Sequence, residues 1–319
     1  MPVFELPLSE LRSYRGRNPR PANFDAFWDA ALLEMKSVDP KVELIPVKSS
    51  SHVADSFDLY FTGVGGARIH AKYLRPKSFS SAHPAILLFH GYTSSSGDWF
   101  DKFAWVSQGY SVAALDCRGQ GGLSQDVGGV TGATMRGQII RGLDDPPQKL
   151  LFRQIFLDTA QLAQIVMQMP EVDPQRVGAT GPSQGGGLTL ACAALEPRLK
   201  RAAPVYPFLC DYQRVWEMDL AVNSYEELRM YFRRFDPRHK REQEIFTKLG
   251  YIDCQHLAPR IRAEVLMATG LMDQTCPPST QFAAYNKLTA KKNMLLYPDF
   301  AHESLPDVAD AVFEFMAGL

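Results

Sequence analysis

The sequence lacks the features that mark membrane, secreted and nucleic-acid-binding proteins. It has no apolar run of the roughly twenty residues that a membrane span needs. Its first twenty residues carry several charged side chains and no apolar core of signal-peptide length. With 34 Lys and Arg against 35 Asp and Glu, the net charge is −1, which gives no electrostatic footprint for nucleic acid or an anionic membrane. We therefore expect a cytoplasmic protein that binds neither.

Cysteine is also sparse. The chain has five cysteines in 319 residues, an odd number, and no two of them form a C-x-x-C pair. This spacing excludes a disulfide framework and the common zinc and thiol-redox motifs. The sequence therefore predicts reduced, mostly packed thiols at Cys117, Cys192, Cys210, Cys254 and Cys276.

The chain does contain apolar segments typical of buried strands, and they alternate with helix-like segments. We predict two strands within 56–75, around a turn at 63–66, and further strands at 84–89, 110–115, 201–205, 264–269 and 293–297. Helices are expected in the segment that contains Trp99, Phe103 and Trp105, near 152–169, 188–195 and 281–288, and from 307 onward. Such alternation predicts an α/β fold with a mostly parallel sheet and helices on both faces. We interpret residues 1–319 as a single domain.

Two segments stand outside this alternation. Residues 1–40 read as an N-terminal arm followed by a helix, with Asn23 or Asp25 as its cap. Residues 208–256 are too long for a plain loop and are amphipathic, so we predict an inserted helical cap. Its basic run, Arg229 to Arg241, is either a partner patch or, as we prefer, a solvated helix face interleaved with core aromatics.

The stretch Val177 to Gly187 carries the clearest chemical signal. It contains the pattern G-x-S-x-G around Ser183, between a strand-like and a helix-like segment. This is the context of a nucleophile elbow, a tight turn that exposes the serine hydroxyl above the sheet. Glycine is needed at 181 and 185 because a Cβ would collide with the neighbouring strand and helix. The alternative is a glycine-rich turn with an idle serine.

On this architecture a nucleophilic serine needs a histidine as its base and an acidic residue that orients the histidine. Both follow the serine in the chain, the acid before the histidine. His302 is the histidine that lies beyond the strands following the elbow, just past the strand that ends at Tyr297. Asp273 follows the preceding strand and is our candidate acid; Asp299 and Asp307 compete but lie too close to the histidine in sequence. Ser183 would then attack an acyl carbon while His302 takes its proton.

An oxyanion hole needs two hydrogen-bond donors. The backbone amide of Gln184 is one candidate, and the amide of Tyr92, after the strand that ends at Phe89, is the other. His90 could act as a second base, but a packed, hydrogen-bonded histidine at a strand end is the preferred interpretation.

Several motifs resemble the acetyl xylan esterase and cephalosporin C deacetylase family of α/β-hydrolases, carbohydrate esterase family seven. The resemblance covers nearly the whole chain. It rests on His90-Gly91-Tyr92, Arg118-Gly119-Gln120, Gly181-x-Ser183-Gln184-Gly185-Gly186, Tyr206-Pro-Phe-Leu, Phe232-Arg-Arg, the segment 277–286, and His302-Glu303.

By this resemblance the chain is a cytoplasmic serine esterase without metal or cofactor that deacetylates short substrates. It implies a hexameric ring with active sites facing an interior cavity. Carried over residue by residue, Ser183, Asp273 and His302 form the triad, and Tyr92 and Gln184 supply the oxyanion amides. Arg118, Gly119 and Gln120 form a structural motif that braces the loops beneath the site.

Pro182 departs from the resemblance, since the family usually has a small residue, commonly glycine, before the serine. Proline fixes φ near −65° and removes a backbone donor, and it also restricts Gly181. Either the acyl pocket is altered in this branch of the family or the position was engineered. We expect Pro182 to modulate the acyl pocket and to favour acyl acceptors other than water, such as alcohols or hydrogen peroxide; the alternative is that it only stiffens the turn.

Three rival interpretations remain open at this point. The chain could be a short-acyl esterase, a lipase or peptidase of the same fold, or a catalytically impaired α/β-hydrolase that serves as a binding scaffold. The natural alcohol, be it a xylo-oligosaccharide, an antibiotic or another acetylated metabolite, does not follow from the sequence.

Overall fold

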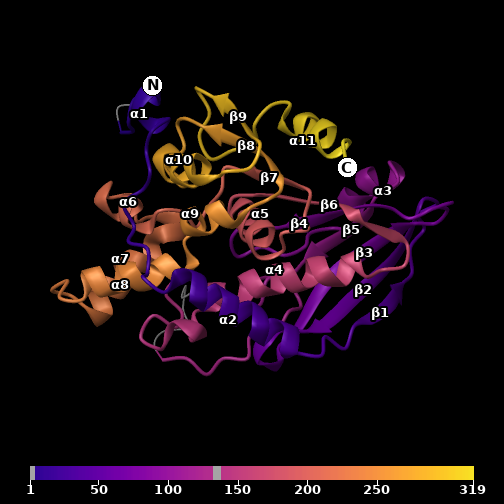
Figure 1. The fold of residues 1–319 in the computed structure, drawn as a ribbon, viewed down its shortest axis with the longest axis horizontal. Helices are drawn as coiled ribbons and strands as arrows, with labels where there is room; N and C mark the ends of the chain where they lie inside the picture. Colours follow the sequence, from indigo (N-terminus) through magenta and orange to yellow (C-terminus); the bar gives the residue numbers. More distant parts are fainter. Residues whose placement is uncertain (1–3, 132–137) are drawn as a thin grey trace.

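The computed structural model describes residues 4–131 and 138–319, and within them the chain forms a sheet of nine strands (Figure 1). The order across the sheet is β1-β2-β3-β5-β4-β6-β7-β8-β9. The strands are β1 (Glu43–Val47), β2 (Ala54–Thr62), β3 (Arg68–Pro76), β4 (His83–Phe89), β5 (Ser111–Leu115), β6 (Val172–Pro182), β7 (Arg201–Val205), β8 (Glu264–Gly270) and β9 (Lys292–Tyr297).

The sheet has an antiparallel and a parallel half. Strands β1, β2, β3 and β5 pair antiparallel, whereas β5, β4 and β6 to β9 pair parallel. The mostly parallel sheet and the β2–β3 hairpin predicted from the sequence are confirmed. Strand β1 was not predicted. It lies at the sheet edge and buries none of its residues, so its sequence lacks the apolar alternation that reveals a strand.

Helices cover both faces of the sheet, and the alternation of side chains along β4 shows why. Ala85 and Leu87 join the core beneath α2 (Phe24–Ser37), α4 (Leu151–Met167) and α5 (Gln184–Leu195). Ile86 points to the opposite face, where it packs with α11 (Val308–Met316). Because successive residues of a strand face opposite sides, a continuous apolar run is what a doubly covered strand requires.

The segment expected to form a helix around Trp99 and Trp105 is shorter than predicted. It forms a 3₁₀ turn (Phe100–Lys102) and the five-residue α3 (Phe103–Ser107). Conversely, α5 begins at Gln184, directly after Ser183 and four residues earlier than predicted. The three glycines that follow Gln184 are the reason that this first turn was not predicted. Glycine is a poor helix former, and the packing of those glycines against other segments outweighs that propensity.

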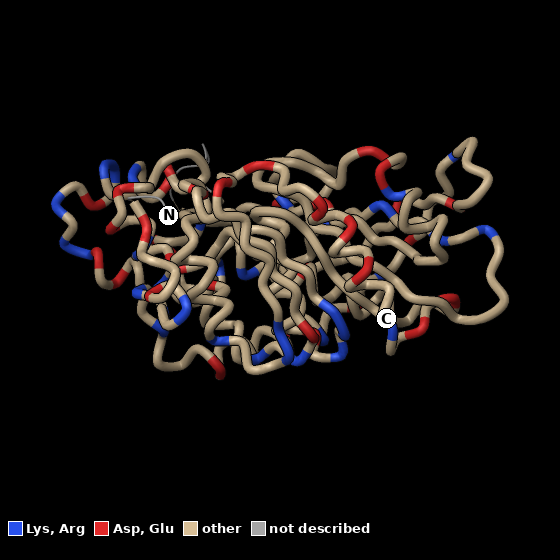
Figure 2. Tube along the Cα trace, turned by 90° about the horizontal axis from the view of Figure 1, so that it is seen from above, with Lys and Arg blue, Asp and Glu red and all other residues tan. Residues whose placement is uncertain are grey.

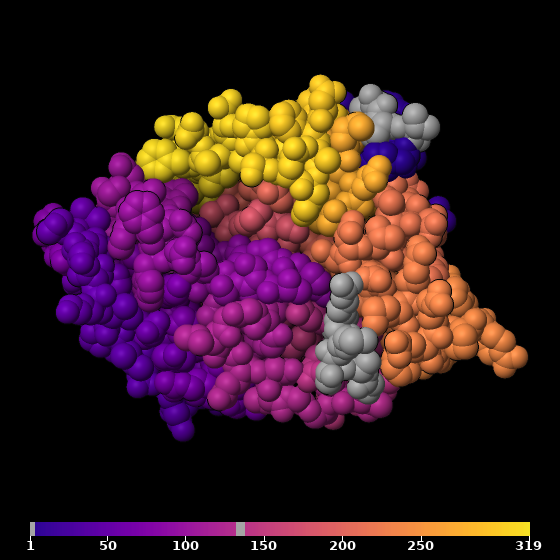
Figure 3. Space-filling model, turned by 180° about the vertical axis from the view of Figure 1, so that it is seen from behind, coloured from indigo at the N-terminus to yellow at the C-terminus, as the bar shows by residue number. Residues whose placement is uncertain are grey.

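Within the described residues, the segment predicted to be an inserted cap forms four α-helices. They are α6 (Tyr212–Glu217), α7 (Glu226–Phe235), α8 (Glu242–Leu249) and α9 (Cys254–Leu257). Figure 3 shows this orange segment at one end of the molecule, away from the N-terminal strands in indigo. In the basic run, Arg229 pairs with Asp219, and Arg241 pairs with Asp144 and Glu244. These ion pairs fit the solvated helix face that we preferred.

The N-terminal arm, which includes α1 (Leu8–Leu11), is tied to the cap by a buried carboxylate. Asp211 accepts hydrogen bonds from the Tyr14 hydroxyl (2.7 Å) and from the backbone amides of Arg17 (2.9 Å) and Asn18 (2.7 Å). The arm therefore packs on the cap before α2 begins. The remaining long helix, α10 (Pro278–Lys287), lies against β8, α6 and α9.

Charges of both signs are interspersed around the molecule (Figure 2), in keeping with the net charge of −1. All five cysteines are buried with free thiols, as predicted. In the described part of the chain, none of the helices combines the length and the apolar character that crossing a bilayer demands.

Candidate active site

Ser183 sits on the tight turn that joins β6 to α5. Its backbone has φ 57° and ψ −119°, a left-handed region that L-residues other than glycine rarely adopt. The turn is held by hydrogen bonds: the Ser183 amide donates to the carbonyl of Val205 (2.9 Å), and the Ser183 carbonyl accepts from the amides of Gly187 and Phe208. The strained geometry of a nucleophile elbow is therefore present at this serine.

Gly181 and Gly185 are required because there is no room for a Cβ at either position, as predicted from the sequence. A Cβ on either Gly181 or Gly185 would collide with the carbonyl oxygen of Phe89 at the end of β4, and one on Gly181 would also meet the backbone of Gly185. The strand and the helix thus approach each other more closely than any side chain allows.

The structure brings together the three residues of the predicted triad. His302 Nε2 lies 3.0 Å from Ser183 Oγ, and His302 Nδ1 lies 2.8 Å from Asp273 Oδ2. Asp273 follows β8 and is fully buried, while the His302 side chain is 25% exposed. It is Asp273 that bonds to the histidine, whereas the competitor Asp307 stands at the start of α11.

Asp273 is held in place by its second carboxylate oxygen. Oδ1 accepts hydrogen bonds from the backbone amides of Thr275 and Cys276, each at 2.8 Å. The carboxylate therefore keeps one oxygen for the protein backbone and presents the other to His302. This fixes the imidazole so that a proton on Nδ1 faces Asp273, leaving Nε2 to accept from the serine.

The loop that carries Tyr92 is fastened to the start of α5. Gln120 and Gln184 form a reciprocal pair of side-chain amide hydrogen bonds (2.7 and 3.0 Å), and Gln120 Oε1 also accepts from the amide of Thr93 (3.0 Å). Gln184 Nε2 reaches the carbonyls of His90 and Gly91. The two segments predicted to supply oxyanion donors are thus adjacent and connected.

Arg118 and Gly119 occupy structural positions. The buried Arg118 guanidinium makes two hydrogen bonds of 2.6 Å with the Asp158 carboxylate on α4 and a third with the Val64 carbonyl (3.0 Å). Gly119 has φ 71°, a conformation that favours glycine. His90 is packed: Nδ1 donates to its neighbour's carbonyl and Nε2 accepts from the Cys117 amide.

Pro182 ends β6, and its ring lines an apolar cavity of about 500 Å³ together with Phe89, Trp105, Val205, Tyr206 and Leu305. Tyr206 packs edge-on against the His302 ring, with 4.8 Å between the ring centroids. Pro182 is therefore adjacent to Ser183 in the chain, and it lines the same cavity as Tyr206, the residue that packs against His302.

Sequence reasoning missed two residues near the site. Burial raises the pKa of the Cys276 thiol well above its usual value, and this thiol contacts the hydroxyl of Ser183. Glu227 on α7 accepts a hydrogen bond from the Tyr92 hydroxyl. Neither residue lies in a sequence motif that indicates a catalytic role, because tertiary packing alone brings both of them near the site.

Among the described residues, the donor atoms of Asp273, Cys276 and His302 form a group compact enough to hold a metal ion, all within 4.8 Å of one another. His302 Nδ1 and Asp273 Oδ2 are already bonded to each other, so a metal there would break the contact that orients the histidine. The donor set thus fits a hydrogen-bonded triad better than a metal centre.

A family model for acetyl xylan esterases matches residues 1–319. The chain belongs to the acetyl xylan esterase family. It is similar to acetyl xylan esterase 1 from Thermoanaerobacterium sp. JW/SL YS485, with 60% identity, a TM-score of 0.97, and coverage of 98% of this chain and 99% of the other. It is also similar to the acetyl xylan esterase from Paenibacillus sp. R4, with 36% identity, a TM-score of 0.94 and the same coverage.

A more distant relative is the acetyl esterase Axe7A of Xylanibacter ruminicola, 25% identical over 290 residues. The match covers 88% of this chain and 63% of that protein, so this chain spans less than two thirds of its length. The family resemblance seen in the sequence motifs is confirmed, and so is the α/β-hydrolase fold of the acetyl xylan esterase family.

Proposed function

We propose that this chain is a serine carboxylesterase that removes acetyl groups from small acetylated alcohols, xylo-oligosaccharides included. The observation that carries the proposal is the position of His302, between the hydroxyl of Ser183 and the buried carboxylate of Asp273. The names of the similar family members, which are acetyl xylan esterases, support acetyl as the acyl group.

In the proposed reaction, His302 Nε2 takes the proton of Ser183 as Oγ bonds to the acetyl carbon. The Gln184 and Tyr92 amides stabilise the resulting oxyanion. When the intermediate collapses, the bond from carbon to the alcohol oxygen breaks, and His302 returns the proton to that oxygen. Water then attacks the acetyl-serine with His302 again as the base, releasing acetate and restoring the Ser183 hydroxyl.

The proposal extends to cephalosporin C as a substrate and to alcohols or hydrogen peroxide as acceptors in place of water. Pro182 supports transfer because it places an apolar ring by the site and offers no backbone donor to order a water molecule. In Pro182→Gly, the ratio of acyl transfer to hydrolysis, measured with a vinyl ester and a small alcohol, should fall. An unchanged ratio would leave Pro182 only the role of stiffening the turn.

The test of the proposed function is a hydrolysis panel on Ser183→Ala. The wild-type chain should hydrolyse p-nitrophenyl acetate and acetylated xylo-oligosaccharides, and the variant should lose at least a thousandfold in kcat because the nucleophile is gone. Acetyl esters should also react far faster than octanoyl esters. Retention of a tenth of the wild-type kcat would contradict the role of Ser183, and equal kcat/KM for octanoyl esters would favour a lipase.

We also propose a hexamer in the cytoplasm, on the strength of the family resemblance. Light scattering at micromolar concentration should report six chains. A monomer under those conditions would contradict the assembly without bearing on the reaction.

A further inference from the structure

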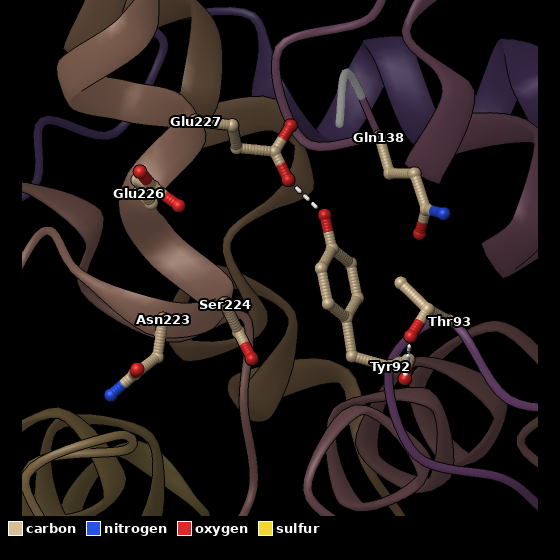
Figure 4. Close-up of a pocket in the computed structure, with 7 residues that line it drawn as sticks. All are labelled: Tyr92, Thr93, Gln138, Asn223, Ser224, Glu226 and Glu227. Carbon is tan, nitrogen blue, oxygen red and sulfur yellow. Dashed lines mark hydrogen bonds between the residues drawn. The ribbon is translucent and has the colours of Figure 1, made fainter. Parts of the chain in front are cut away.

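A polar cavity of about 390 Å³ lies beside the loop that carries Tyr92 (Figure 4). Its walls come from three parts of the chain: Tyr92 and Thr93 after β4, Gln138, and the 3₁₀ turn 223–225 with the start of α7. From this last part, Asn223, Ser224, Glu226 and Glu227 line the cavity. The cap and the sheet domain therefore meet around it.

This cavity shares its wall with the nucleophile turn. The Tyr92 ring packs on Phe208, with 5.3 Å between centroids, and the amide of Phe208 donates to the carbonyl of Ser183 (2.9 Å). On the other side, the Thr93 amide bonds to Gln120, which is paired with Gln184. Any molecule in the cavity would thus contact the loop that borders the reacting serine.

The wall is rich in hydrogen-bonding groups and, among the described lining residues, contains no Lys, Arg or His. Gln138 Oε1 is buried without a hydrogen-bond partner in the described residues. Figure 4 shows Gln138 and Ser224 on opposite sides of the Tyr92 ring. A buried amide without a partner costs stability unless a ligand or water completes its bonds.

Glu227 holds the aromatic wall in place. Its carboxyl is 2% exposed, accepts from the Tyr92 hydroxyl and, at 3.0 Å, from the Ile140 amide. Burial raises the pKa of Glu227 to about 8, so this group is mostly uncharged at pH 7. Among the described lining residues there is no cation to pair with an anionic ligand, and the wall offers carboxyl, amide and hydroxyl groups that can hydrogen-bond an uncharged one.

We propose that this cavity binds the neutral, hydroxyl-rich alcohol part of the ester, the sugar portion of an acetylated oligosaccharide, while its acetyl group lies at Ser183. Gln138 and Ser224 hydrogen-bond the sugar hydroxyls, and the Tyr92 ring supplies the apolar face on which a sugar ring packs. The inference rests on the proposed esterase function and adds a binding site to it.

The test compares two substrates on the double variant Gln138→Ala, Ser224→Ala. Two lost hydrogen bonds of about 1 kcal/mol each correspond to roughly a tenfold to thirtyfold rise in KM for acetylated xylobiose. The kcat/KM for p-nitrophenyl acetate should stay within twofold, because that ester has no sugar. The matched control is Gln108→Ala, Ser107→Ala on the exposed end of α3, which lines another cavity and should change neither value.

A second measurement avoids turnover of the sugar ester. Free xylobiose should inhibit p-nitrophenyl acetate hydrolysis by the wild type, and the double variant should need about tenfold more xylobiose for equal inhibition. Unchanged KM and unchanged inhibition in a folded variant would overturn the binding site while leaving the esterase proposal intact. Absence of p-nitrophenyl acetate hydrolysis in the wild type would instead overturn the proposed function, and calorimetric titration with xylobiose would then decide on the cavity alone.

Discussion

Among the described residues, two histidines are hydrogen-bonded to aspartates, and their surroundings differ in a way that suits different roles. His302 has one carboxylate partner, Asp273, and its other nitrogen faces the Ser183 hydroxyl. His70 on β3 has a carboxylate on each nitrogen, with Asp116 Oδ2 at 2.6 Å from Nδ1 and Asp58 Oδ1 at 2.9 Å from Nε2. His302 is a quarter exposed, whereas His70 is 1% exposed.

The difference bears on the proton transfer that we propose for His302. Burial by itself lowers the pKa of His70, but hydrogen bonds to Asp116 and Asp58 outweigh it and raise that pKa above its ordinary value. The pKa of Asp116, which burial alone would raise, is held well below its usual range by His70 and by the amides of Leu123 and Ser96. Both ring nitrogens of His70 are therefore held by carboxylates, and we call this group of His70, Asp58 and Asp116 the clamp. By contrast, only Nδ1 of His302 is held by a carboxylate, and its Nε2 faces the Ser183 hydroxyl.

The largest expected effect comes from Asp273→Asn. The side-chain oxygen can still accept from the Thr275 and Cys276 amides, but the amide group favours the wrong tautomer of His302, so kcat should fall by about 10⁴-fold. Steady-state kinetics with p-nitrophenyl acetate measure this, and the thermal midpoint should change little. A loss of less than tenfold would remove Asp273 from the proposed mechanism.

The matching change in the clamp is Asp116→Asn, which should act on stability rather than on rate. Leaving the buried His70 ring with one carboxylate instead of two should cost about 3–5 kcal/mol in the free energy of unfolding. Denaturation with urea measures that loss, and kcat of the folded fraction should stay within twofold. Asp58→Asn is the control with a smaller effect, since Asp58 is partly exposed. A large fall in kcat would break the distinction between the two histidines.

The smallest effect is the pH dependence of stability due to His70. Its folded-state pKa is raised, so its contribution is fully present below the unfolded value of about 6.5 and is lost as pH rises through the folded-state pKa. The difference in free energy of unfolding between wild type and His70→Gln should therefore shrink from pH 6 towards alkaline pH. A difference that grows with pH would contradict the charged clamp.

The tight turn at Ser183 and its proximity to His302 and Asp273 could be predicted from the sequence because their signals are local or ordered along the chain. Gly181 and Gly185 flank Ser183 within five residues, and His302 follows the last strand of a regular alternation. The central parallel strands β4, β5, β7 and β8 were equally readable, since burial on both faces makes each one a nearly continuous apolar run.

The rest depends on contacts between distant segments. Glu227 meets Tyr92 across 135 positions and His70 meets Asp116 across 46, and no local pattern encodes such pairs. Strand β1 was missed because an exposed edge strand needs no apolar alternation. The glycines 185–187 hid the first turn of α5, because their role is close packing against Phe89, Val205 and Phe208 rather than helix propensity.

The central claim is that Ser183 is a nucleophile activated by His302. Its most direct test is reaction with a fluorophosphonate, followed by mass spectrometry of the digested protein. The account predicts one phosphonate per chain, on the peptide that contains Ser183, and no rapid labelling of His302→Ala. An unlabelled wild-type protein, or a label on another residue, would contradict the claim.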